Sequence, residues 1–140
     1  MKEKDDKKLA ETFIARDRFA REMGIELVAV SAGRATARLE ITEAHHNGLG
    51  MTQGGAVFTL ADLAFAAASN SHGTVAVAIN ASISFLKATS GGVLTAQAEE
   101  ITANPKLATY TVRVTDDTGD VVAIFQGMVY RKRDRIHPPC

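Results

Sequence analysis

Cysteine is almost absent from this sequence of 140 residues, and its single thiol, Cys140, belongs to the last residue. One terminal cysteine cannot form a disulfide within the chain, so the sequence favours a reducing, intracellular environment. Tryptophan is absent and aromatic residues make up 6% of the chain, whereas apolar residues make up 46%. We therefore expect an aliphatic, alanine-rich core in one domain that spans residues 1–140.

The chain also lacks an excess of charge of one sign, because sixteen basic residues balance sixteen acidic ones. A nucleic-acid-binding protein would be expected to carry a basic surface. No apolar run is long enough to span a bilayer. The charged residues 1–8 are not followed by the apolar segment of a secretory signal. The sequence therefore predicts a cytoplasmic protein with neither nucleic acid nor membrane as a partner.

The hydrophobic pattern predicts a helix, a hairpin, a second helix and then four strands. Helical spacing runs from Leu9 to Gly24, and glycine is a favoured residue just beyond a helix end. A second helix is expected over residues 55–71, and residues 1–8 and 132–140 are expected to be loose tails. Alternating patterns predict strands over 25–30, 35–41, 75–86, 93–102, 107–115 and 121–131. This order is typical of an α+β fold, with one antiparallel sheet packed on a helix.

The second helix carries the strongest functional signal. Its only charged residue between positions 55 and 68 is Asp62, and a helix that is apolar nearly all round is usually buried nearly all round. At about 100° per residue, one narrow and weakly polar stripe contains Gly55, Thr59, Asp62, Ala66 and Ser69. The stripe faces either solvent or a cleft or second subunit, and its lack of Lys, Glu and Arg favours the second interpretation. Asp62 would then be partly desolvated, which raises a carboxyl pKa and makes a better base.

The segment Gln53-Gly54-Gly55 precedes this helix. The first backbone N–H groups of a helix have no partner within it, and they carry the positive end of its dipole. Glycine lets a ligand approach such a backbone closely, which suits the stabilisation of an oxyanion. A tight turn into the helix is the simpler interpretation of two adjacent glycines, and the pair alone does not exclude it.

The spacing of Gly55 and Asp62 limits how one helix could use both. Seven residues at a rise of 1.5 Å place them about 10 Å apart along the axis. One acyl carbonyl group cannot easily contact both. Two such helices, antiparallel about a two-fold axis, could bring Gly55 of one close to Asp62 of the other. The spacing therefore leads to the hypothesis of a homodimer with two shared sites.

The loop and the second helix resemble the signature of the PaaI-like (phenylacetic acid degradation) thioesterases of the hotdog-fold superfamily. The matching residues are His46-Asn47-Gly48, Gly50, Gln53-Gly54-Gly55, Phe58, Leu60-Ala61-Asp62, Ala64-Phe65 and Ser69-Asn70. The resemblance implies an antiparallel sheet wrapped around a long central helix and a dimer that usually forms a homotetramer. It also implies hydrolysis of an aryl-, phenylacetyl-like or medium-chain acyl-CoA without metal or cofactor.

The resemblance also assigns roles to individual residues. Asp62 would activate water or attack the carbonyl directly, the Gly55 N–H would polarise the thioester oxygen, and Asn47 would hold the water or the thioester. Gln53 stands where the family usually has histidine, so this position can orient or polarise the substrate but cannot transfer a proton. The residues expected to contact substrate are His46, Gly54, Thr59 and Ser69.

Three other functions compete with this one. A zinc site at His45 and His46 is disfavoured, because neither a cysteine nor a spaced histidine accompanies them. A hotdog dehydratase or hydratase is disfavoured because Gln53 leaves no evident histidine beside Asp62. A non-catalytic acyl-CoA binding module or ligand sensor stays open, and Gln53 gives it modest support. The acyl group and the choice between coenzyme A and a carrier protein also stay open.

Overall fold

The computed structural model describes residues 2–137, so Cys140 lies outside the described residues. The N-terminal half contains α1 (Lys2–Ala15), α2 (Arg18–Met23), β1 (Glu26–Ser31), β2 (Arg34–Glu40), the 3-10 turn η1 (Glu43–His45) and α3 (Gly54–Ser69). The C-terminal half contains β3 (Thr74–Phe85), β4 (Val93–Ala103), β5 (Leu107–Thr115) and β6 (Val121–Arg135). This order agrees with the predicted hairpin, second helix and four strands.

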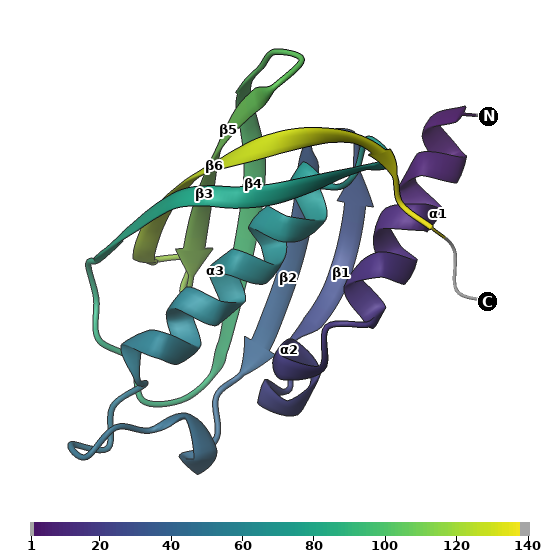
Figure 1. Ribbon diagram of the computed structural model, residues 1–140. Coiled ribbons are helices and arrows are strands. Elements are labelled where there is room, and N and C mark those ends of the chain that lie inside the picture. Colours follow the sequence, from purple (N-terminus) through teal and green to yellow (C-terminus); the bar gives the residue numbers. More distant parts are fainter. Residues whose placement is uncertain (1, 138–140) are drawn as a thin grey trace.

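The six strands form one antiparallel sheet in the order β1-β2-β4-β5-β6-β3, which leaves β1 and β3 at its edges. Figure 1 shows the sheet curving around α3, with α1 and α2 beside β1. The predicted α+β architecture, a sheet wrapped around a central helix, is confirmed.

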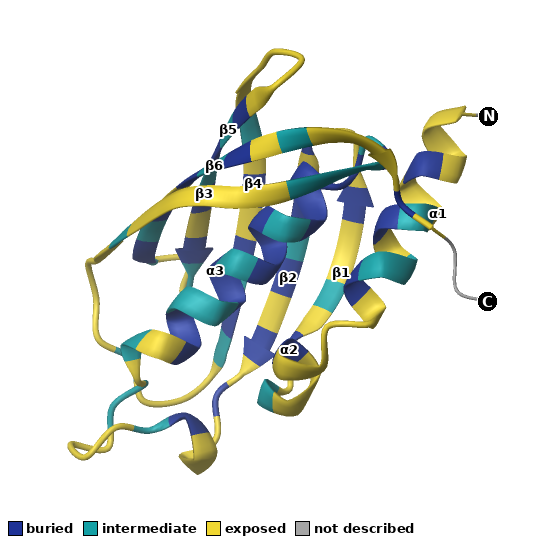
Figure 2. Ribbon diagram, in the orientation of Figure 1, coloured by how far each residue is buried: buried dark blue, intermediate teal, exposed yellow. Residues whose placement is uncertain are grey.

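Small side chains allow α3 to lie close to the sheet. Alternate residues of β2 and β4 that face the helix are buried, and many of them are alanine, as are several buried residues of α3 itself (Figure 2). Gly127 of β6 makes room for an aromatic ring, since a Cβ atom there would lie 2.6 Å from Cζ of Phe65. The scarcity of aromatics in the sequence thus corresponds to a thin, alanine-rich interface between helix and sheet.

The prediction of loose tails was wrong for the described part of both ends. Helix α1 begins at Lys2, and strand β6 continues to Arg135. The two ends hold each other, because the Arg135 guanidinium donates to the buried carboxylate of Asp6, and Ile136 is buried with its N–H 2.9 Å from the Gly73 carbonyl oxygen. The Asp6–Arg135 pair joins residues far apart in the sequence, so the local charge pattern could not reveal it.

The first predicted helix is in fact two helices. The chain leaves the helical conformation at Asp17, whose carboxylate accepts a hydrogen bond from the Ala20 N–H at 3.0 Å and so caps the start of α2. The predicted end at Gly24 is confirmed, since this glycine adopts the left-handed conformation with φ of 87°. None of the helices within residues 2–137 is long and apolar enough to cross a membrane.

Candidate active site

The first turn of α3 begins in an exposed loop. Gly55 and Gln53 are exposed, and the Gln53 side chain folds back so that its carbonyl oxygen accepts the hydrogen bond of the Gly55 N–H. Gln53 is therefore the N-cap of α3, and its oxygen fills the position in which a ligand oxygen could meet the same N–H. The expected donor is present, and the protein itself occupies it.

The loop before α3 is held by its own hydrogen bonds. The Asn47 side-chain oxygen accepts from the N–H groups of Leu49 at 2.9 Å and Met51 at 3.1 Å. The Thr52 N–H donates to the Thr89 carbonyl oxygen at 2.7 Å, which ties the loop to the segment after β3. Because only the oxygen of the Asn47 amide has these roles, its NH₂ group can still donate to a bound molecule.

Asp62 lies on the less buried face of α3. In this helix the residues that are not buried are Gly54, Gly55, Phe58, Thr59, Asp62 and Ala66. This set contains four of the five residues of the predicted stripe. The carboxylate is half-buried, and among residues 2–137 no hydrogen bond or ion pair to it is found.

The Asp62 carboxyl group holds its proton more tightly than an ordinary aspartate. Burial raises its pKa, and the negative charge of Asp17, at the junction of α1 and α2, raises it further. The predicted direction of the shift is confirmed. The structure adds Asp17, which the stripe argument missed, although an aspartate just before a helical segment is a recognisable N-cap signal.

The remaining predicted site residues divide into two groups. Thr59 lies one turn after Gly55 and donates to its carbonyl oxygen at 2.7 Å, so it belongs to the same end of the helix. Ser69 is buried at the other end, where its hydroxyl donates to the Ala66 carbonyl oxygen at 3.2 Å. The structure therefore brings together Asn47, Gln53, Gly54, Gly55 and Thr59, places Asp62 two turns along α3, and does not bring Ser69 to this cluster.

The two histidines of the loop both make structural contacts. His45 is buried, its Nδ1 accepts from the Thr42 N–H at 2.9 Å, and its Nε2 donates to the Met23 carbonyl oxygen at 2.7 Å. The His46 ring donates to the Ser90 carbonyl oxygen at 2.7 Å. Both rings brace the loop, and no group of three or more potential metal ligands is present among residues 2–137.

An aromatic side chain that sequence reasoning missed lies against the start of α3. Phe85, the last residue of β3, approaches Gly54 so closely that a Cβ atom there would lie 3.1 Å from Cζ of its ring. The sequence offered only a weak signal, an apolar residue at the end of a strand. The contact leaves little room for a side chain at position 54, where the φ angle of the glycine is not positive.

Comparison with known proteins gives the family and related sequences. Residues 49–123 match the family model described as the thioesterase superfamily. The chain is 34% identical over 116 residues to the acyl-coenzyme A thioesterase PaaI of Escherichia coli. The aligned residues make up 82% of this chain and 83% of that protein. The chain is 29% identical over 116 residues to the 1,4-dihydroxy-2-naphthoyl-CoA hydrolase of Listeria monocytogenes, covering 81% of this chain and 94% of that one.

The structural comparison agrees with these sequence matches. The solved structure of the E. coli PaaI protein from the phenylacetic acid degradation operon superposes with a TM-score of 0.91 at 30% identity. The alignment covers 98% of this chain and 100% of that one. The arrangement of sheet and helix is therefore the hotdog fold, and the predicted PaaI-like resemblance is confirmed.

Proposed function

The chain belongs to the thioesterase superfamily, and from this premise we propose that it hydrolyses the thioester of an aryl-, phenylacetyl-like or medium-chain acyl-CoA. The enzyme class, a thioester hydrolase, follows from the family and from its named relatives. The observation that supports the proposed site most is the presence on α3 of two groups: the Gly55 N–H, which only the exposed Gln53 side chain covers, and the half-buried Asp62 carboxylate with its raised pKa.

The proposed chemistry divides between these two groups. The Gly55 N–H, at the positive end of the helix dipole, stabilises the charge that develops on the thioester oxygen. Asp62, with its raised pKa, is a stronger base than an exposed aspartate and can take a proton from water or attack the carbonyl carbon itself. The NH₂ group of Asn47 holds the water or the thioester.

Gln53 would act before the reaction begins. In the free enzyme its side-chain oxygen accepts the hydrogen bond of the Gly55 N–H. The substrate carbonyl oxygen would replace it, and the exposed Gln53 side chain would turn aside to orient the thioester through its NH₂ group. This role requires hydrogen bonding alone, so the glutamine in place of the family's usual histidine is compatible with hydrolysis.

Two subunits would complete each site. Gly55 and Asp62 of one helix are about 10 Å apart along the axis, so we propose that Asp62 works with the Gly55 N–H of a second copy. Strand β3 is an edge of the sheet, and its exposed Val77 and Ile79 suit pairing with another subunit. A homodimer with two shared sites, assembled into a homotetramer, is the proposed form.

Labelled water can reveal direct attack by Asp62, one of the two routes open to it. If Asp62 attacks the carbonyl carbon, the C–S bond breaks and the sulfur leaves as a thiolate that takes a proton from solvent. Water then hydrolyses the anhydride, which releases the acid and regenerates the Asp62 carboxylate. A single turnover in ¹⁸O-water would then leave ¹⁸O in the Asp62 carboxylate if water attacks the aspartyl carbonyl. Label found only in the released acid is the result expected from activation of water, and also from attack of water on the acyl carbonyl of the anhydride.

The test of the proposed function is thiol release from a panel of acyl-CoAs by the purified protein, with the Asp62→Asn variant alongside. The expected result is turnover of aryl or medium-chain members by the parent protein and a loss of about 10²- to 10⁴-fold in the variant. Equal turnover by both proteins would show that the Asp62 carboxylate takes no part in the reaction. Tight binding of acyl-CoA without release would instead favour the non-catalytic binding module.

A further inference from the structure

Residues 86–92, between β3 and β4, form a strap that contacts the loop before α3. The Thr89 carbonyl oxygen accepts a hydrogen bond from the Thr52 N–H at 2.7 Å, and the hydroxyl groups of the same two threonines lie 2.8 Å apart. The Ser90 carbonyl oxygen accepts from the His46 ring at 2.7 Å. The strap therefore holds the loop through both backbone and side-chain hydrogen bonds.

The two loop residues that the strap holds are paired with each other. His46 and Thr52 form an isolated antiparallel β-bridge that closes the turn bearing Asn47. Helix α3 begins shortly after this bridge, at Gly54. Contacts between the strap and the bridge therefore restrain both Asn47 and the first turn of α3, which contains the Gly55 N–H.

Both ends of the strap are anchored on the turn between β5 and β6. Near its start, the Lys87 ammonium group lies 2.6 Å from a carboxylate oxygen of Asp116 and 2.8 Å from one of Asp120. Just beyond its end, the Val93 N–H donates to a carboxylate oxygen of Asp117 at 3.1 Å. The proposed reaction gives these three aspartates no role, and their common effect is to fix the strap to the sheet.

A hollow of about 580 Å³ lies between the strap and the loop. Asn47 lines it from the loop, Thr89 from the strap and Gly54 from α3. The separation of strap and loop therefore sets the width of the space beside the Gly55 donor. A misplacement of about 1 Å in such a site can lower the rate of an enzyme by about a hundredfold.

These contacts assign a role to a residue outside the proposed catalytic groups. We propose that Thr89 is a positioning residue, whose hydroxyl group holds the loop where Asn47 and the Gly55 N–H meet the thioester. Any residue at position 89 could supply the carbonyl oxygen, so the requirement for threonine lies in the hydroxyl pair with Thr52. This inference rests on the proposed thioesterase function and adds a residue to it.

The experiment compares two pairs of threonines. Thr89→Val removes the hydroxyl group of one pair, and Thr89→Ser keeps it. Thr109→Val is the matched control, because Thr109 is half-buried like Thr89 and its hydroxyl group lies 3.1 Å from that of Thr102. Thr89→Val is expected to lower kcat for acyl-CoA by about three- to tenfold, with KM nearly unchanged. Thr89→Ser and Thr109→Val are expected to keep the kcat of the parent protein.

Amide hydrogen exchange measures the same restraint without substrate. Thr89→Val is expected to speed exchange of the Thr52 and Gln53 N–H groups by about three- to tenfold. Thr109→Val is expected to leave these rates unchanged. Unchanged rates in Thr89→Val would contradict the restraint whether or not the protein hydrolyses acyl-CoA. Faster exchange in Thr89→Val, with no turnover by the parent protein, would instead contradict the proposed function and with it the role of Thr89 in that reaction.

The kinetic results can also overturn the assignment. A kcat that is retained in folded Thr89→Val, or lost equally in Thr89→Val and Thr109→Val, would show that the hydroxyl pair does not position the loop. A rise in KM with kcat retained would show that Thr89 contacts the substrate instead.

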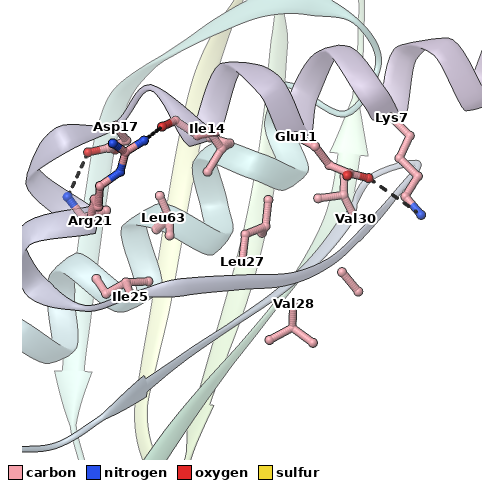
Figure 3. Close-up of a pocket in the computed structure, with 13 residues that line it drawn as sticks. Lys7, Glu11, Ile14, Asp17, Arg21, Ile25, Leu27, Val28, Val30 and Leu63 are labelled. Carbon is pink, nitrogen blue, oxygen red and sulfur yellow. Dashed lines mark hydrogen bonds and ion pairs between the residues drawn. The ribbon is translucent and has the colours of Figure 1, made fainter.

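A second pair of variants covers the case in which Thr89→Val does not fold. Lys87→Met releases the start of the strap at an exposed position, and it is expected to lower kcat by about two- to fivefold. Lys7→Met is its matched control, because Lys7 pairs with Glu11 at 3.8 Å beside a different cavity (Figure 3). That cavity, of about 510 Å³, lies between α1, α2 and β1, and its walls among residues 2–137 include none from the strap.

Salt gives this second pair a readout that stability alone would not move. Because salt screens exposed ion pairs, added salt is expected to lower kcat at saturating substrate in the parent protein and in Lys7→Met, but not in Lys87→Met. Equal kcat in Lys87→Met and Lys7→Met at low salt would overturn the assignment.

Discussion

The two ends of α3 differ in how their polar groups are satisfied. At the N-terminal end Gln53 and Gly55 are exposed, and one flexible side chain caps the first turn. At the C-terminal end Asn70 is 1% exposed, donates to the Ala66 carbonyl oxygen at 2.8 Å and accepts from the Ala76 N–H at 3.0 Å. Both polar atoms of the Asn70 side chain therefore have a partner inside the protein.

This difference indicates that the two ends have different tasks. Groups that are fixed by buried partners stabilise the fold, whereas donors covered only by a movable side chain can be offered to a ligand. We therefore expect substitutions at the N-terminal end to change turnover more than stability. Substitutions at the C-terminal end are expected to do the reverse.

The largest expected effect is at Gly55. Gly55→Pro removes the N–H but is tolerated in the first turn, where that group has no helical partner. A loss of about 10²- to 10³-fold in kcat is expected, as for removal of one oxyanion donor. Steady-state kinetics and a thermal melt of the same preparation measure both quantities. A large fall in melting temperature with kcat retained would show that Gly55 serves stability and not turnover.

The opposite pattern is expected at Asn70. Asn70→Ala leaves the Ala76 N–H without its partner and is expected to lower the free energy of unfolding by roughly 1–3 kcal/mol. Turnover per folded molecule should stay the same, because Asn70 is four turns away from Gly55 along α3. Urea unfolding and active-site-normalised kinetics test this, and a selective loss of kcat would contradict it.

A smaller effect on stability is expected from the hydrogen bonds around Glu100, which include His72 just beyond the C-terminal end of α3. The Glu100 carboxylate accepts from the Tyr110 hydroxyl at 2.7 Å and bonds the His72 ring at 2.9 Å. Burial alone would raise the Glu100 pKa, but these hydrogen bonds and nearby positive charge, including Arg131, outweigh it and hold the pKa below its ordinary value. The ionised group therefore stabilises the fold above the unfolded pKa, about 4.3, and this contribution is lost as pH falls through the folded value.

Glu100→Gln tests that contribution. It is expected to lower the free energy of unfolding by roughly 1 kcal/mol at neutral pH, with the difference from the parent protein shrinking as the solution becomes acidic. Unfolding curves across the pH range measure it. A difference that stays constant down to the lowest pH would show that the charge of Glu100 is not involved.

The smallest expected effect is on the pH dependence of turnover. Because Asp62 must be ionised to act, kcat/KM should fall as pH drops through its raised pKa, above the ordinary value of about 3.9. Asp17→Asn keeps a good helix cap but removes the second cause of the shift, so the acid limb should move to lower pH. An acid limb that does not move would show that Asp17 does not raise the Asp62 pKa.

Much of the fold could be predicted because it depends on local patterns. Alternation identified the strands, Gly24 marked a helix end, and the absence of charge around Asp62 identified the central helix. The break at Asp17 was missed because apolar spacing continued across it. The start of helix α1 at Lys2 was missed because this helix is held by Arg135, at the other end of the chain.

The candidate site could be predicted only in part, for the same reason. The sequence indicated Gly55 and Asp62 through spacing along one helix, and their roles remain predictions. The hydrogen bond from Gly55 to Gln53 and the approach of Phe85 to Gly54 depend on side-chain position and on a contact between distant segments. Periodicity contains neither kind of information.

The most direct test combines two inactive variants in one oligomer. Co-expression of Asp62→Asn with Gly55→Pro yields mixed dimers in which one site receives both intact groups and the other receives neither. With random pairing, the account predicts recovery of about a quarter of the parent activity, while each variant alone is inactive. No recovery in verified mixed dimers, or substantial activity in either variant alone, would contradict a site built from Gly55 of one copy and Asp62 of another.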